Sequence, residues 1–232
     1  MKSSFYVLGM PLDERKPTPR WVAEVLEKST LIIGESPKIV SRVLAKLTLK
    51  PDVQIFYLDN LSVRDKSELT KQLKNYANQG VCVSLFSDMG MPILFDPGNE
   101  VLQSAHSLEY TIRCVPGPTS WGTACALSGW SPPFLIVGFL SPKVEERQKQ
   151  LRQYASGTGH LVLMDTPYRF QALLKDCIQI LGAERHTFLA WEIGSSSEFY
   201  FWGTLKDLER EAERRSLKKG EFILLIQEAG VK

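Results

Sequence analysis

The sequence lacks a long apolar run. Its 232 residues contain no stretch that matches the roughly 7–15 apolar residues of an export signal or the ~18 of a membrane span. The apolar residues nearest the start are soon followed by Asp13 and Glu14. We therefore expect no export signal, no membrane span and a cytoplasmic protein.

The sequence also lacks an excess of either positive or negative charge. The chain has 28 Lys and Arg against 26 Asp and Glu, a formal net charge of +2. Such a balance does not indicate nucleic-acid binding through the overall field, although a local basic patch is compatible with it. Apolar residues at 44% and charged residues at 23% are typical of a folded globular protein and exclude wholesale disorder.

Metal-site, hydrolase and dinucleotide motifs are missing as well. The four cysteines stand far apart without a CxxC pair, which indicates reduced, packed thiols. The three histidines occur without an HExxH or GxSxG motif, so the pattern predicts neither a metal site nor a Ser-His-Asp hydrolase. The phosphate-binding patterns GxGxxG and GxxxxGK[ST] are absent. We expect no metal in this protein.

The first half alternates short apolar runs with longer amphipathic segments. The apolar runs predict strands at residues 5–8, 31–33, 55–58, 81–86 and 110–115. The amphipathic segments predict helices at residues 18–26, 37–47, 66–79 and 101–108. Alternation of this kind is typical of α/β folds, so we expect a mainly parallel sheet with helices on both faces.

The second half also alternates but contains one close pair of strands. Strands are predicted at residues 134–139, 160–164, 187–192, 198–203 and 221–226, and helices at 120–127, 144–154, 168–180 and 205–215. The short turn at residues 194–197 favours an antiparallel pair and hence a mixed sheet. The Pro/Gly cluster at Gly117 and Pro118 predicts a boundary between two α/β domains, residues 1–117 and 118–232.

Three turn-rich segments directly follow predicted strands, at residues 9–13, 87–98 and 115–120. Each combines glycine, which lets the backbone approach a ligand closely, with proline, which restricts the shape of the loop. The carboxyl ends of parallel strands meet at one edge of a sheet, where α/β proteins bind ligands. Any one segment alone reads as an ordinary turn, but three at one edge predict a binding site.

Seven short motifs then occur in the order found in one family. Residues 85–98, LFSDMGMPILFDPG, resemble the SDAGTPLISDPG segment of the tetrapyrrole methylase superfamily, and in particular its branch of small-subunit ribosomal RNA methyltransferases. The further matches are VPGPTS at 115–120, ALSG at 126–129, GFLSP at 138–142, DTPYR at 165–169, AWE at 190–192 and KGE at 219–221.

The resemblance implies a methyltransferase that uses S-adenosylmethionine (SAM), with two α/β domains, the cofactor in the cleft between them and a homodimeric assembly. The N-terminal domain would form the acceptor side, and the C-terminal domain would complete the SAM site. By motif, the cofactor-binding positions are Pro11 in the first loop, Met89, Gly90, Met91 and Leu94 in the second, and Thr119 and Ser120 in the third. Two later positions, Met164 and Gly194, complete the set.

Two carboxylates are candidates for proton removal from a methyl acceptor. Methyl transfer from a sulfonium is an in-line displacement that depends on alignment, and a hydroxyl acceptor also needs a base. Glu35 and Asp88 end adjacent predicted strands and are the catalytic candidates. The alternative interpretation is that both only cap the helices that follow.

The acceptor is left open among three hypotheses. The first is RNA, with the basic helices at 143–152 and 206–219 contacting phosphates, although their interleaved acids equally fit solvated helix faces. The second is a tetrapyrrole or another small molecule, and the third is a SAM-binding relative without catalysis. The stretches at 8–15 and 34–38 depart from the PTPIGNLxD and AEDTR patterns of the ribosomal RNA enzymes, and these loops would face the substrate.

Overall fold

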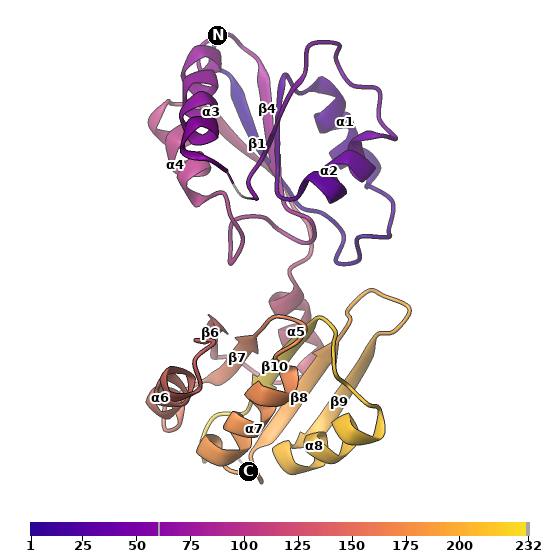
Figure 1. Cartoon of the computed structure of the whole chain (residues 1–232), viewed down its shortest axis with the longest axis vertical. Coiled ribbons are helices and arrows are strands. Elements are labelled where there is room, and N and C mark those ends of the chain that lie inside the picture. Colours follow the sequence, from indigo (N-terminus) through magenta and orange to yellow (C-terminus); the bar gives the residue numbers. More distant parts are fainter. Residues whose placement is uncertain (60, 231–232) are drawn as a thin grey trace. The chain divides into compact units, whose positions relative to one another are not determined.

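The computed structural model describes residues 1–59 and 61–230, and the chain forms two compact units, Met1–Thr119 and Ser120–Lys232 (Figure 1). The predicted boundary at residues 117–118 lies two residues before this division. Within the described residues, no helix is both long enough and apolar enough to cross a membrane.

The first unit is built on a parallel sheet, as predicted. Its five strands lie in the order β3-β2-β4-β1-β5, and every neighbouring pair is parallel. The elements are β1 (Ser4–Leu8), α1 (Arg20–Lys28), β2 (Leu31–Gly34), α2 (Pro37–Leu44), β3 (Gln54–Tyr57), α3 (Val63–Tyr76), β4 (Cys82–Phe86), α4 (Asn99–Ser107) and β5 (Thr111–Val115).

Helices cover both faces of this sheet because its strand residues are apolar on both sides. Leu8, Ile32 and Phe86 pack with residues of α1 and α2. Phe5 and Leu85 belong to the opposite core, with residues of α3 and α4. Figure 1 shows α1 and α2 on one side of the strands and α3 and α4 on the other. The alternation of side chains along each strand therefore produces two separate cores.

The second unit has the predicted mixed sheet, in the order β6-β7-β10-β8-β9. Strands β6 and β7 are parallel, whereas β10 is antiparallel to both β7 and β8, and β8 is antiparallel to β9. The elements are α5 (Ser120–Ser128), β6 (Phe134–Phe139), α6 (Val144–Tyr154), β7 (His160–Met164), α7 (Phe170–Leu181), β8 (His186–Trp191), β9 (Phe199–Thr204), α8 (Leu205–Arg214) and β10 (Phe222–Ile226).

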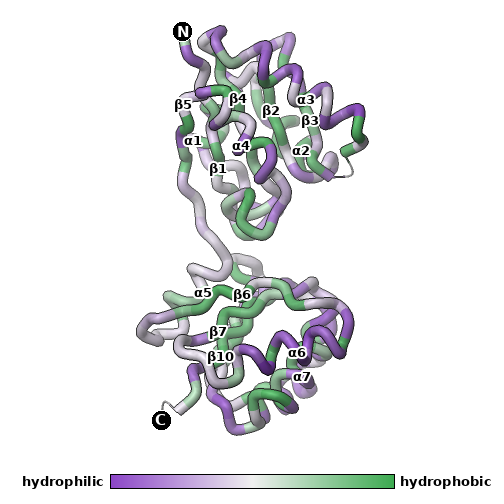
Figure 2. The backbone as a smooth tube through the Cα atoms, turned by 90° about the vertical axis from the view of Figure 1, so that its left-hand side faces the viewer, coloured by the Kyte–Doolittle hydropathy of each residue, from purple (hydrophilic) through white to green (hydrophobic). Residues whose placement is uncertain are grey.

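Helices pack on both faces of the second sheet as well. Residues of α5 share a core with Val162 and Leu225 on one face, while α6, α7 and α8 share the larger core on the other. Figure 2 shows the apolar colouring concentrated on central strands such as β2, β4 and β10, whereas α3 and α6 are largely hydrophilic. The polar helices contribute only a narrow stripe to each core.

Helix α3 begins earlier than the sequence pattern predicted. The expected start was residue 66, but the helix begins at Val63 because Ser62 and Asp65 form a capping box. The Ser62 hydroxyl accepts from the Asp65 backbone N–H at 3.1 Å, and the Asp65 carboxylate accepts from the Ser62 backbone N–H at 3.1 Å. These two bonds satisfy N–H groups that the first turn would otherwise leave unpaired.

Candidate functional site

The three predicted loops meet at the carboxyl edge of the first sheet. They follow β1, β4 and β5, and β1 lies between the other two strands. The chain leaves β1 toward α1 on one face and leaves β4 toward α4 on the other. Adjacent strands whose connections diverge in this way mark the switch point at which open α/β sheets bind ligands.

Backbone hydrogen bonds join these loops to one another. The Gly9 N–H donates to the Val115 carbonyl at 2.9 Å, which links the ends of β1 and β5. The Met10 N–H donates to the Gly90 carbonyl at 2.8 Å, and the Gly90 N–H donates to the Pro11 carbonyl at 3.3 Å. The structure therefore brings Pro11 and Gly90, two of the predicted cofactor positions, into direct contact.

Two glycines allow the loops after β1 and β5 to approach closely. A Cβ added to Gly9 would lie 2.4 Å from both Cα and N of Gly117, and 2.8 Å from the Met91 sulfur. The Gly117 N–H points at the same sulfur, at 3.3 Å. No larger residue fits at Gly9 without moving backbone, so this glycine is required by contact rather than by its own dihedral angles.

Gly90 is required for a different reason. Its φ of +67° lies in the left-handed region, and it is buried beneath neighbouring loops. An added Cβ would lie 3.3 Å from the Leu12 side chain and 3.4 Å from the Pro118 carbonyl oxygen. The loop after β4 thus turns sharply here and keeps its backbone against the other two loops.

The other predicted cofactor positions are spread over both units. Met89 and Thr119 are half-buried, Leu94 is 51% exposed, and Ser120 is the first residue of α5. In the second unit, Met164 ends β7 and is 6% exposed, and Gly194 has a φ of +81° in the exposed turn between β8 and β9.

The two catalytic candidates are held by each other's loops at the ends of the neighbouring strands β2 and β4. Glu35 Oε2 accepts from the Asp88 backbone N–H at 3.0 Å, and Asp88 Oδ1 accepts from the Ser36 backbone N–H at 3.1 Å. The capping alternative is wrong for Glu35, because the Ser36 side chain caps α2 by accepting from the Ile39 N–H.

Glu35 has an altered acidity. Burial raises its pKa to about 7, the backbone hydrogen bond from Asp88 opposes this rise, and the charges of Asp96, Asp88 and Asp59 add to it. Burial also raises the pKa of the Asp96 carboxyl. A carboxyl with a pKa near 7 exchanges its proton under physiological conditions, which is the property required of a general base.

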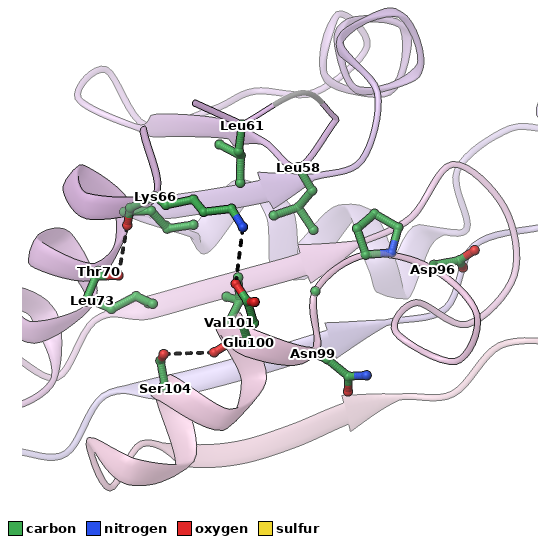
Figure 3. Close-up of a pocket in the computed structure, with 13 residues that line it drawn as sticks. Leu58, Leu61, Lys66, Thr70, Leu73, Asp96, Asn99, Glu100, Val101 and Ser104 are labelled. Carbon is green, nitrogen blue, oxygen red and sulfur yellow. Dashed lines mark hydrogen bonds and ion pairs between the residues drawn. The ribbon is translucent and has the colours of Figure 1, made fainter. Parts of the chain in front are cut away.

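A pocket of about 330 Å³ lies beside this edge, between α3 and α4 (Figure 3). Leu58, Leu69 and Val101 supply apolar lining, and an ion pair of 3.5 Å between Lys66 and Glu100 spans it. Asp96 also lines this pocket. The sequence offered no signal for it, because its lining comes from segments that fall on different elements.

The second unit contains an ion pair between the buried Asp165 and the half-buried Arg169 that the sequence analysis missed. Asp165 Oδ1, directly after β7, accepts from the Arg169 Nε at 2.6 Å and from the Thr166 backbone N–H at 2.6 Å. Arg169 also donates to the Leu140 carbonyl at 3.2 Å. The Asp–x–x–x–Arg spacing after a strand was the available signal. The ion pair lies within the motif at 165–169, and the bond from Arg169 to Leu140 joins this motif to the one at 138–142.

Basic residues of helix α6 do not all face solvent, contrary to the expectation of a phosphate-contacting helix. Arg147 and Asp176 are both buried and form an ion pair of 2.7 Å. Arg147 additionally donates to the carbonyls of Ser141 and Pro142. It therefore stabilises the packing of α6 on α7 and is not available to a phosphate.

Comparison with known proteins gives one consistent result. Residues 4–209 match the family model of the Tetrapyrrole (Corrin/Porphyrin) Methylases. The Ribosomal RNA small subunit methyltransferase I of Leptospira borgpetersenii serovar Hardjo-bovis (strain L550) is 30% identical over 208 residues, which cover 88% of this chain and 79% of that protein. The enzyme of the same name from Rickettsia prowazekii (strain Madrid E) is 29% identical over 227 residues, covering 97% and 79%.

Solved structures share the fold at lower identity. The methyltransferase CobJ aligns with a TM-score of 0.67 at 16% identity, covering 100% of this chain and 96% of that one. Uroporphyrin-III-C-methyltransferase from Thermus thermophilus aligns with a TM-score of 0.60 at 17% identity, covering 97% and 94%. These similarities confirm the predicted fold class and the predicted resemblance.

Proposed function

The chain belongs to the tetrapyrrole (corrin/porphyrin) methylases and is a SAM-dependent methyltransferase, and we propose that its acceptor is a ribose hydroxyl of small-subunit ribosomal RNA. The observation that carries this choice is the identity of 29–30% to enzymes named for that RNA, over most of the chain. The structural neighbours that are named as precorrin or uroporphyrin methyltransferases share only 14–19%.

The proposed cofactor contacts in the first unit are Pro11, Met89, Gly90, Met91, Leu94 and Thr119, and those in the second are Ser120, Met164 and Gly194. The residues present suit a sulfonium cofactor. Loop backbones held by glycine offer amide and carbonyl groups, and half-buried methionines offer apolar contact. The carboxylates of Glu35, Asp88 and Asp96 lie at the same edge and favour a positive charge there.

In the proposed mechanism, SAM supplies the methyl group, and the chain aligns the acceptor and removes its proton. Glu35 is the proposed base, because a pKa of about 7 leaves much of the carboxyl ionised and basic near neutral pH. Asp88 is the second catalytic candidate and holds the Glu35 loop through the Ser36 N–H at 3.1 Å. Holding the reacting groups in line supplies much of the rate enhancement of such a displacement.

Transfer of tritium from labelled SAM tests the acceptor. The protein is added to a lysate of a strain that lacks it, and RNA and small-molecule fractions are counted separately. We expect label in small-subunit ribosomal RNA. Label in a tetrapyrrole or other small molecule would refute the proposed acceptor, and SAM binding without transfer to either fraction would identify a silent relative.

A matched variant separates cofactor binding from chemistry. Glu35→Gln keeps the size of the side chain and an oxygen to accept the Asp88 N–H, but cannot take a proton. We expect SAM affinity within about twofold of wild type and transfer reduced by about 10²–10⁴-fold, the usual contribution of a general base. Undiminished transfer would remove Glu35 from the mechanism.

A homodimer is also proposed, from the family resemblance. Light scattering is expected to give about twice the 26.2 kDa of one chain. A mass of one chain at assay concentration would contradict it. The cytoplasmic location stays a prediction.

A further inference from the structure

The loops β7–α7 and α8–β10 lie side by side at one edge of the second sheet. The Gly220 N–H donates to the Pro167 carbonyl at 3.2 Å, which ties the two loops together. A Cβ on Gly220 would lie 2.3 Å from the ring of Trp191, so only glycine lets the second loop approach this closely. The edge is consequently a well-defined surface, although it is formed from loops.

The α8–β10 loop is also held on its other side, where two glutamates join it to the end of β8. The Glu192 N–H donates to the Glu221 carbonyl at 2.8 Å, and the Glu221 N–H donates to the Glu192 carboxylate at 2.7 Å. These bonds continue the β8–β10 pairing to the residue just beyond its last registered pair. Residue 219, directly before Gly220, is thereby kept near the end of β10.

An aromatic ring and an ammonium group are presented on this surface. Tyr168 is 70% exposed, and the Lys219 Nζ lies 4.6 Å from the centroid of its ring. The cation covers one face of the ring, and the high exposure leaves tyrosine surface open to solvent. A large exposed aromatic with an adjacent cation is a common arrangement for contact with a nucleotide base and its phosphate.

Most other cations of this region are already paired. Glu211 binds both Arg214 and Arg215, and Arg215 also lies 4.3 Å over the ring of Phe199. By contrast, Lys218 and Lys219 make no ion pair with any carboxylate in the part of the chain that the structure describes. Among the basic residues of 206–219, the positive charges that form no ion pair within the described residues therefore lie at the C-terminal end of this segment.

We propose that Tyr168, Lys218 and Lys219 form a contact surface for single-stranded RNA, with a base stacked on the tyrosine and phosphates paired with the lysines. This inference rests on the proposed ribosomal RNA acceptor and adds the surface that holds the strand. Stacking on an aromatic face tolerates any base, whereas the lysines contribute a charge attraction that depends on salt. The surface therefore supplies affinity and position more than sequence selection.

Binding of a fluorescein-labelled single-stranded RNA of about 12 nucleotides tests the surface. We expect Tyr168→Ala to weaken binding by about tenfold and Tyr168→Phe to restore it, because the ring carries the stacking. The double variant Lys218→Ala/Lys219→Ala should lower the magnitude of the slope of log affinity against log salt by about 1.4, since each phosphate contact with a single strand contributes ~0.7.

The control is Lys206→Ala. It removes the same kind of charge from the same unit, but Lys206 pairs with Glu184 and lies beside the far end of β9. Its salt slope and affinity should equal those of wild type. If the Tyr168 and lysine variants bind RNA like wild type, or if Lys206→Ala weakens binding equally, this surface is not the RNA contact.

SAM binding by calorimetry on the same samples separates this inference from the proposed function. Unchanged SAM affinity with weakened RNA binding supports the inference. Loss of SAM affinity in Tyr168→Ala with unchanged RNA binding would overturn it, and would assign the ring to the cofactor. Wild-type protein that binds SAM but not RNA would refute both the surface and the RNA acceptor, while leaving the methyltransferase assignment intact.

Discussion

Gly9→Ala is the most direct test of how the three loops are assembled. The added methyl would lie 2.4 Å from two backbone atoms of Gly117, where ordinary contacts begin at about 3.4 Å. Neither partner is the flexible end of a side chain, so the loops after β1 and β5 must separate by about 1 Å. This separation would lengthen and weaken the hydrogen bond from the Gly9 N–H to the Val115 carbonyl, which is now 2.9 Å long.

The structure sets the size of the expected effect. Overpacking of this kind costs about 1–3 kcal/mol in well-packed regions. For a unit of roughly 100 residues, each kcal/mol lowers Tm by about 4–8 °C, so we expect a fall of about 5–20 °C. Because Met91 and Pro11 belong to the same assembly, SAM affinity should fall at least about tenfold, equal to ~1.4 kcal/mol.

Thermal unfolding without ligand and calorimetry with SAM give both quantities on one sample. Gly157→Ala is the control, since its added Cβ meets only the Tyr154 carbonyl oxygen at an ordinary 3.6 Å. That variant should change neither value appreciably. A folded Gly9→Ala protein with wild-type Tm and wild-type SAM affinity would refute the requirement for close approach at this position.

Three further predictions concern single residues. Gly90→Val should lower SAM affinity at least about tenfold and Tm as well, because φ of +67° strains any L side chain; intact affinity in a folded variant would remove this loop from the site. Glu35→Gln should become more stable relative to wild type as pH rises from about 4.5 to 7. The difference has an upper limit of ~3 kcal/mol, and we expect a smaller value because solvent screens this half-buried carboxyl. Urea unfolding at pH 5 and pH 8 measures the difference, and an equal difference at both pH values would contradict the prediction. Arg147→Ala should lower the free energy of unfolding, measured in urea, by about 3–5 kcal/mol, because it leaves Asp176 buried without its partner. The control Arg152→Ala, at an exposed position, should change it by no more than about 0.5 kcal/mol. Equal effects of the two variants would show that the buried pair does not stabilise the fold.

The sign of the Glu35 prediction follows from its raised pKa. In the unfolded chain the carboxyl ionises near its ordinary value of 4.5, whereas in the folded chain it holds its proton until about pH 7. Its contribution to stability is fully present below pH 4.5 and is lost as pH rises through 7. Glutamine has no such transition, so the advantage of the variant appears only on the alkaline side.

Sequence pattern alone was sufficient for the element order and the fold class. Local patterns predicted the strands β4 and β7 from their apolar runs, and the turn between β8 and β9 from its short, turn-rich segment. Such patterns suffice because the periodicity of apolar residues and the preferences of turn residues involve only a few neighbouring positions. The family motifs are also local patterns, and the family-model match over residues 4–209 confirms the family that they indicated. Helix ends were less accurate, as the Ser62–Asp65 capping box shows.

Only the tertiary structure decided how residues far apart in sequence act together. The contact of Gly9 with Gly117, the reciprocal bonds of Glu35 and Asp88 and the pairing of Arg147 with Asp176 each join different elements. A residue's pKa and its availability to a ligand depend on burial and on such neighbours, which no local pattern contains. The sequence could therefore indicate that Glu35 is a candidate base and that residues 206–219 are basic. The packing determined that this carboxyl is half-buried with a pKa near 7. It also determined that, among the basic residues of 206–219, Lys218 and Lys219 are the two that form no ion pair with a carboxylate of the described residues.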